Sequence, residues 1–176
     1  RRLPEILQLY GYNTSAIWGE TILRFYTGFG DGFSQELHQR SAITEGPVAF
    51  EQWLRSGPSE PFFLLMHDLD AHLVLREDEE RWAHLLTDPV QGCDARGPDN
   101  VYQALLPTLG QAGARDHATS HYHGTLRGYD RVLGDRLEQL ERQGLLDNTY
   151  VVLLSNHGED LAEHGGRFDH GRLHDT

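Results

Sequence analysis

Side chains that bind metals and anions follow two apolar runs of the chain. Asn156 and His157 come just after the run 150–154, and His72 comes shortly after the run 61–66. Imidazole nitrogens and amide oxygens are both ligands for divalent cations. Imidazole also donates hydrogen bonds to anions and can protonate a leaving oxygen near neutral pH. These residue types favour metal-assisted chemistry on a negatively charged substrate.

The segment after the second run also has an interpretation that involves no chemistry. Asparagine and serine are frequent helix N-caps, and acids such as Glu159 and Asp160 in a first turn complement the helix dipole. His164, in "EHGG", would then lie at the end of that helix, where a cation is favourable. A helix start does not account for His157, which stands before a glycine at the end of a predicted strand. His157 is therefore predicted to be functional.

The sequence predicts a long helix between the two apolar runs, and this helix indicates how the polar side chains are positioned. It begins near Ser120 and ends at Gly144, and its apolar stripe is formed by Tyr122, Leu126, Tyr129, Leu133, Leu137 and Leu140. A strand, a helix and a second continuous apolar strand indicate a parallel α/β sheet. Such a sheet carries its polar site at the carboxyl ends of its strands. We therefore expect His72, His157 and His170 to share one edge.

Shorter elements are predicted in the rest of the chain. Apolar spacing indicates a helix over 3–9, a short strand over 15–18 and a helix over 47–56, with Pro47 in its first turn. Residues 77–116 are polar and interrupted by "DPVQGCDARGPDN". They predict a helix, an irregular excursion and a short second helix.

Composition narrows the classes of function. The 176 residues are 38% hydrophobic, which is enough for a core, and carry a net charge of −12. The acidic balance disfavours nucleic acid and anionic membranes as partners. No apolar run is long enough for a transmembrane segment, and the first residues show no signal-peptide pattern. Cys93 is the only cysteine, which excludes an internal disulfide and a cysteine-rich zinc site.

Several segments resemble the sulfatase family of the alkaline-phosphatase-like superfamily. The most specific likeness lies in "NTYVVLLSNHGEDLAEHGGRFDHGRLHD", and others lie in "PFFLLMHDLDAH", "LPEILQLYGYNTSAIW" and "GYDRVLGDRLEQLERQGLLDNT". The resemblance implies a three-layer α/β/α fold with a mainly parallel sheet, alkaline-phosphatase-like and incomplete. It also implies that residues 1–176 form the central part of a catalytic domain, with 77–116 as a variable excursion.

The resemblance assigns roles to four residues. Asn156 and His157 fall on positions that bind one divalent metal ion, and His72 and His170 fall on catalytic positions that contact the oxygens of the transferred group. The family favours calcium. Because Asn156 brings no charge and His157 is a softer ligand than a carboxylate, manganese or zinc is also possible.

The nucleophile that the resemblance implies, a residue that matures to formylglycine, would lie upstream of Arg1. The parent is expected to be a metal-dependent sulfuric ester hydrolase acting on a sulfate- or phosphate-ester small molecule or glycan. This chain alone is expected to be inactive, and Cys93 is interpreted as a bystander. Two alternatives stay open: a phosphodiesterase, phosphonate hydrolase or phosphoryl-headgroup transferase of the same superfamily, and a noncatalytic or inactive sulfatase-like domain.

Overall fold

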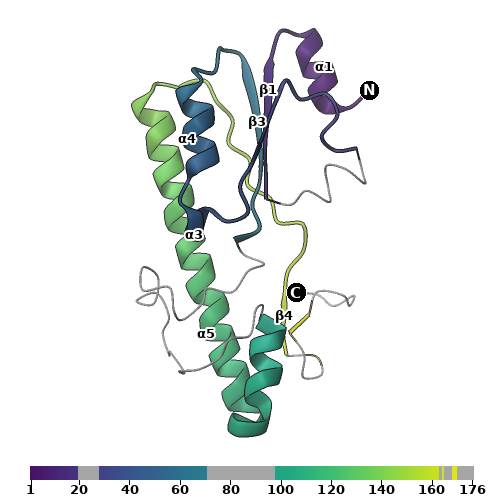
Figure 1. The fold of residues 1–176 in the computed structure, drawn as a ribbon, viewed down its shortest axis with the longest axis vertical. Helices are drawn as coiled ribbons and strands as arrows, with labels where there is room; N and C mark the ends of the chain where they lie inside the picture. The colour runs from purple at the N-terminus through teal and green to yellow at the C-terminus, as the bar shows by residue number, and fades with distance from the viewer. Residues whose placement is uncertain (20–27, 71–97, 163, 165–167, 170–176) are drawn as a thin grey trace. The chain divides into compact units, whose positions relative to one another are not determined.

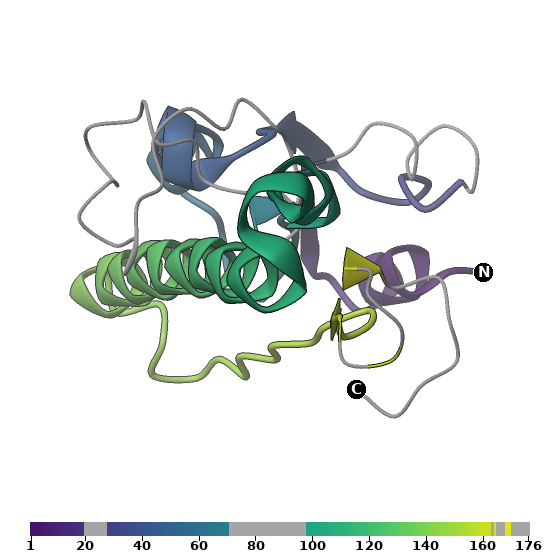
Figure 2. The same cartoon turned by 90° about the horizontal axis from the view of Figure 1, so that it is seen from below.

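A computed structural model describes residues 1–19, 28–70, 98–162, 164 and 168–169. The chain divides into two compact units, Arg1–Asp70 and Ala71–Thr176, and each is described by itself. The first unit combines a parallel sheet with short helices, and the second is built around one long helix (Figures 1 and 2).

Three parallel strands form the sheet of the first unit, in the order β2-β1-β3. They span Asn13–Trp18 (β1), Gln35–His38 (β2) and Phe62–His67 (β3). β1 is central, and all of its residues after the first are buried, as expected for a parallel strand covered on both faces. β3 was predicted to be fully buried. It is half-buried along its length because it has only one neighbour among the described strands.

The helices of this unit are α1 (Leu3–Leu9), α3 (Ala42–Glu45) and α4 (Val48–Arg55). The predicted helices over 3–9 and 47–56 are confirmed, whereas β2 and α3 were not predicted because neither is long enough to show a period. α4 forms where apolar residues recur at helical spacing, and its buried residues are Ala49, Phe50, Trp53 and Leu54.

Helices cover both faces of the sheet. Consecutive strand residues point to opposite faces, so Phe62 and Phe63 mark the two sides. Phe62 packs edge-on against Trp53 of α4, with ring centroids 5.5 Å apart. On the other side, Gln8 of α1 donates a hydrogen bond to Thr14 Oγ1 at 2.9 Å, and Thr14 is the register partner of Phe63. α1 and α4 therefore lie on opposite faces, which makes three layers (Figure 1).

The second unit is organised by α5 (Pro98–Arg142), which breaks at Gly110, where φ is 67° and ψ is 177°. The break folds α5 into two arms that lie side by side (Figures 1 and 2). Ala114 and Ala118 form the core of this hairpin, and the residues packed against them are Leu105, Leu106, Leu161 and Ala162. The predicted excursion 77–116 is thus helical from Pro98 onward, while residues 77–97 lie outside the described residues.

The buried face of α5 differs from the predicted apolar stripe. Of the six stripe residues only Leu140 is buried, and Leu126 is exposed. The buried side chains are instead Ala114, His117, Ala118, Ser120, His121, Thr125, Val132, Arg136 and Leu140. Four of them, His121, Thr125, Val132 and Arg136, lie one residue before a residue of the predicted stripe, about 100° around the helix. Hydrophobicity alone pointed to the wrong face because this one is made largely of small and polar residues.

The run 150–154 is not a strand, contrary to the prediction. Its residues have no regular secondary structure, and their exposed fractions range from 55% at Val151 to 99% at Tyr150. No described strand pairs with this run. Without a neighbouring strand there is no backbone ladder to hold an apolar segment in a buried sheet.

The helix start considered for the residues after 154 is also wrong. Asp160–Leu161 forms the short strand β4, which pairs antiparallel with β5 (Phe168–Asp169). His164 therefore does not end a helix. Among the described residues, even the long helix α5 lacks an apolar stretch able to cross a bilayer.

Candidate active site

The three parallel strands of the first unit end together at one edge. Trp18, the last residue of β1, is in register with His38 at the end of β2 and with His67 at the end of β3. The carboxyl edge of a parallel sheet is where the following loops build ligand sites. β3 leads toward His72, which lies outside the described residues.

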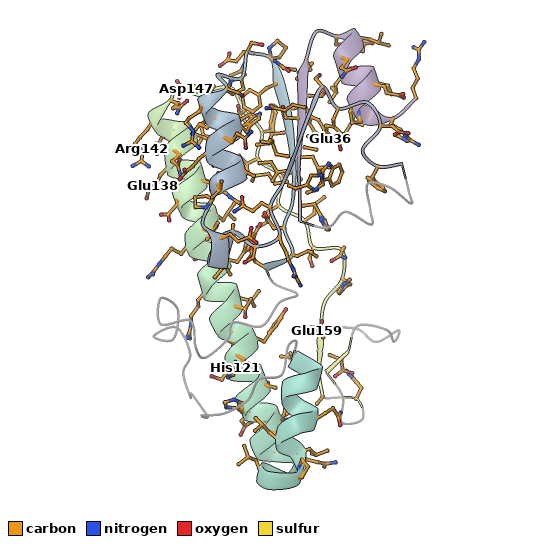
Figure 3. The ribbon with its side chains drawn as sticks, viewed as in Figure 1. Glu36, His121, Glu138, Arg142, Asp147 and Glu159 are labelled. Carbon is orange, nitrogen blue, oxygen red and sulfur yellow. The ribbon has the colours of Figure 1, made fainter. Side chains whose placement is uncertain are left out.

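Two side-chain nitrogen atoms at this edge, one on Trp18 and one on His67, differ in whether they have a hydrogen-bond partner among the described residues. Trp18 Nε1 donates a hydrogen bond to Glu36 Oε2 at 2.8 Å (Glu36 is labelled in Figure 3), so the indole donor is satisfied. The Nδ1 atom of His67 is buried and has no hydrogen-bond partner among the described residues. A buried nitrogen left in that state is unfavourable. His67 is therefore a candidate to bond a group that binds at this edge.

Gly19 shows how tightly the strand ends approach each other. Its backbone nitrogen donates to the His67 carbonyl oxygen at 2.7 Å. A Cβ atom at position 19 would lie 2.6 Å from that same oxygen and 3.2 Å from Leu69. Only glycine fits this approach without a shift of the backbone.

A buried glutamine holds the loop that follows β2. Gln39 is 5% exposed, and its backbone nitrogen donates to the Trp18 carbonyl oxygen at 3.0 Å. Its side-chain Oε1 accepts from the Ala49 nitrogen at 3.0 Å, and its Nε2 donates to the Gly46 carbonyl oxygen. The side chain thereby ties the turn before α4 to the sheet edge.

A buried aspartate holds the segment that follows β3. Asp70 accepts hydrogen bonds from the Ser41 hydroxyl, the Ala42 nitrogen and the Ile43 nitrogen. Burial raises the pKa of the Asp70 carboxyl above its ordinary value of 3.8, and the three hydrogen bonds act in the opposite direction without cancelling it. Desolvation of the charged form, with a smaller contribution from the charge of Asp68, thus outweighs the three donors.

The predicted metal ligands lie in the second unit. Asn156 and His157 are exposed and belong to an irregular segment. The Ser155 hydroxyl donates to the His157 carbonyl oxygen at 2.5 Å, and His157 Nδ1 lies 2.8 Å from the Gly158 carbonyl oxygen. Since a carbonyl oxygen only accepts, Nδ1 must be the protonated nitrogen in this contact. The neutral ring then carries its lone pair on Nε2, the atom that a metal would use.

Polar contacts stabilise the chain just beyond these residues. Asp160 is buried, and its Oδ2 atom lies 3.3 Å from Nδ1 of the more exposed His164. Burial, and to a smaller extent the charge of Glu159, raises the pKa of the Tyr122 phenol above 10.0. Asp160 and His164 therefore hold the turn after the predicted metal ligands.

The described residues do not assemble the predicted site as a whole. Asn156 and His157 are neighbours in sequence, whereas His72 and His170 lie outside the described residues. Within the described parts of the chain, no three histidine, cysteine, aspartate or glutamate residues gather in a group that could hold a metal ion. The donor types of Asn156 and His157 suit a divalent cation, and they supply two of the ligands such an ion needs.

Several buried polar residues were missed by the sequence analysis. Gln39, Ser41 and Asp70 lie outside any periodic pattern, and only serine just before a helix is a recognised local signal. His117 and His121 lie one turn apart on α5, with ring centroids 4.4 Å apart and both side chains buried (His121 is labelled in Figure 3). Their spacing by four residues could have drawn attention to them.

Comparison with known proteins agrees with the resemblance seen in the sequence. The family model described as Sulfatase matches residues 48–176, which is most of the chain. The chain is also similar to an arylsulfatase of Clostridium perfringens (strain 13 / Type A), with 27% identity over 145 residues. That match covers 76% of this chain and 29% of the arylsulfatase. No solved structure matches.

These matches agree with the fold of the first unit. A parallel three-stranded sheet with helices on both faces is the architecture expected of an incomplete α/β fold of the alkaline-phosphatase type. The matched residues include β3, α5 and the segment with Asn156 and His157. The chain therefore belongs to the sulfatase family.

Proposed function

We propose that the whole protein is a metal-dependent sulfuric ester hydrolase, acting on a sulfate-ester small molecule or glycan. The observation that carries this proposal is the family match over residues 48–176. The parallel sheet, whose three strands end in register, supports it, because a site at that edge is the usual use of such a sheet.

In this proposal Asn156 and His157 help to hold one divalent metal ion, by an amide oxygen and by imidazole Nε2. Calcium is the first candidate by family, and manganese or zinc also suits an imidazole ligand. When bound, such an ion polarises an ester oxygen and offsets negative charge. The tautomer of His157, with Nδ1 toward the Gly158 carbonyl oxygen, supports its assignment as a ligand.

His72 and His170 are the proposed catalytic residues. Protonated imidazole donates hydrogen bonds to sulfate oxygens and offsets the charge that develops on them. Imidazole also titrates near neutral pH, so either ring is suited to protonate the leaving oxygen. The arrangement requires both residues to reach the same group, and this can be tested by substitution.

The nucleophile is proposed to come from a part of the protein upstream of Arg1, where formylglycine, if present, would lie. The chain spans about 29% of the length of the arylsulfatase that it matches, which leaves ample room for such a segment in the relative. The 176-residue chain by itself is then expected to show no turnover, since covalent catalysis needs its nucleophile.

Turnover by the whole protein tests this function. We expect hydrolysis of p-nitrophenyl sulfate that is lost with EDTA and restored by a divalent cation. Hydrolysis of p-nitrophenyl phosphate or a phosphodiester in preference to the sulfate would replace the proposal by a phosphoryl-transferring activity. No turnover of any of these esters, with metal supplied, would favour a noncatalytic role.

Three histidine variants of the whole protein separate the proposed roles. His157→Ala should reduce both the bound metal, measured by elemental analysis, and the rate. His170→Ala should leave the metal content unchanged and lower kcat by about 10²–10³-fold, as loss of one charge-stabilising donor does. His123→Ala, at an exposed position on α5, is the matched control and should change neither. A His170→Ala rate within about threefold of wild type would remove His170 from the site.

A further inference from the structure

Helix α1 carries apolar side chains on the face that points away from the sheet (α1 is labelled in Figure 1). Gln8 marks the face toward the sheet, because its Nε2 atom donates to Thr14 Oγ1 and to the Gly32 carbonyl oxygen, both at 2.9 Å. Residues two positions apart on a helix point about 200° away from each other. Ile6 and Tyr10, which stand two positions before and after Gln8, therefore lie on the opposite face.

Leu3, Ile6 and Tyr10 form an apolar row on this outer face, which we call the α1 stripe. Their spacing of three and four residues gathers them along one side of the helix. Their exposed fractions are 56%, 39% and 76%. Within α1, which lies wholly in the described part of the chain, only Pro4 is buried. A helix in a globular protein normally turns its apolar stripe toward a core, so α1 is oriented as if a further layer covered it.

The chain enters α1 from a fixed point. The Arg2 nitrogen donates to Glu5 Oε2 at 2.7 Å, and the Arg2 carbonyl oxygen accepts from the Ile6 nitrogen at 3.0 Å. The Arg2 guanidinium also forms an ion pair with Asp31. These contacts hold the backbone of Arg2 directly before the first residue of the α1 stripe. Any chain that precedes Arg2 therefore leaves beside the stripe.

We propose that the α1 stripe is the docking surface for the segment of the whole protein that precedes Arg1. This inference rests on the proposed function, which takes the nucleophile from such a segment. The family relative provides a measure of the chain that is available, since the match covers 29% of the arylsulfatase. Docking would fix the segment that carries the nucleophile against the unit whose strands end at the candidate edge.

The tether favours this occupant over a second copy of the chain. A segment joined to Arg1 meets the stripe at an effective concentration in the millimolar range, whereas a second copy must associate from dilute solution. The three side chains of the stripe carry no charge. The surface that docks on them is therefore expected to be apolar, because its burial is what stabilises the contact.

Photocross-linking in the whole protein tests which segment covers the stripe. Tyr10→p-benzoylphenylalanine places an aromatic cross-linker on the stripe. Val48→p-benzoylphenylalanine is the control, because Val48 begins α4 and is also 56% exposed. We expect irradiation to join position 10 to a peptide upstream of Arg1 in the same chain, identified by mass spectrometry. The yield should exceed that from position 48 by about tenfold or more.

Amide hydrogen exchange of the whole protein is the second measurement. Ile6→Gln keeps a good helix former while it removes apolar surface from the stripe. If the stripe is covered, this substitution should raise exchange of the α1 amides about tenfold or more, since burial of such a side chain is worth about 1.5–3 kcal/mol. Val48→Gln is the matched control and should leave exchange of the α1 amides unchanged.

Several outcomes would overturn the inference. A cross-link from position 10 to a second copy, or to residues 71–176 of the same chain, would show that another surface covers the stripe. A yield at position 10 no higher than at position 48, or a change in α1 exchange below about twofold in Ile6→Gln, would show that the stripe faces solvent. Neither measurement uses turnover. A protein that hydrolyses no sulfate ester would therefore contradict the proposed function, while the cross-link still decides which segment docks on α1.

Discussion

The runs 61–66 and 150–154 are alike in sequence and differ completely in the structure. Both are short, continuous and apolar, and both lead into histidine-containing polar segments. The first becomes β3, which pairs with β1 along six residues and packs against α4 through Phe62 and Trp53. The second has no strand partner among the described residues, and Leu154 is 84% exposed.

The difference shows that an apolar run favours burial of its side chains but does not by itself form a strand. Burial of such side chains is favourable, yet the backbone groups of an extended segment need a neighbouring ladder before they can leave water. β1 provides that ladder for β3. The run 150–154 has apolar side chains but no neighbouring strand among the described residues. An exposed apolar segment of this kind is prone to pair with another strand.

Truncation of a buried side chain in the central strand should have the largest effect. Ile17 in β1 is 1% exposed. Ile17→Ala is expected to lower the free energy of unfolding by about 2–5 kcal/mol, because it removes apolar contacts and leaves a cavity. Urea unfolding followed by tryptophan fluorescence measures this, since Trp18 and Trp53 are both buried in the same unit. A loss below about 0.5 kcal/mol would mean that the sheet is not packed as described.

A methyl group at the strand ends should have the next largest effect. Gly19→Ala would place a Cβ atom 2.6 Å from the His67 carbonyl oxygen, so β1 and β3 must separate. We expect destabilisation of about 1–3 kcal/mol, the usual result of overpacking. Gly134→Ala is the control, since Gly134 is on α5 with nothing near its Cβ position, and alanine there should stabilise by about 0.5–1 kcal/mol. Equal effects of the two substitutions would contradict the close approach.

The buried carboxyl group of Asp70, just after β3, should make the free energy of unfolding depend on pH. Because burial raises the Asp70 pKa above 3.8, the folded chain binds this proton more tightly than the unfolded chain. The resulting stability is fully present below pH 3.8 and is lost as pH rises through the folded pKa. The free energy of unfolding of wild type minus that of Asp70→Asn should therefore be larger at pH 4 than at pH 7. The opposite slope in urea titrations at the two pH values would show that the hydrogen bonds dominate.

Truncation in the exposed run should have the smallest effect. Val152 is 73% exposed. Val152→Ala is expected to change the free energy of unfolding by no more than about 0.5 kcal/mol, as surface substitutions do. Far-UV circular dichroism during urea unfolding is the appropriate measurement, because it follows α5. A loss above about 2 kcal/mol would break the contrast with Ile17 and show that the run 150–154 is buried in solution.

The sequence by itself determined those helices and strands that depend on residues close together in the chain. Helices over 3–9 and 47–56 follow from apolar spacing within one or two turns, and the apolar run 61–66 sufficed for β3. The same kind of information carried the resemblance to the sulfatase family, which the family match confirms. The assignments of His72, His170, Asn156 and His157 remain predictions.

Only the tertiary structure decided which surfaces are buried and which polar groups meet. The buried face of α5 includes His121 and Thr125, which no hydrophobic period selects. Asp70 finds its donors at Ser41 and beyond, far away in the sequence. The physical reason is the same in both cases and for the unpaired run 150–154. Helix periods arise between residues three or four apart, whereas burial and strand pairing depend on whatever the rest of the chain places alongside.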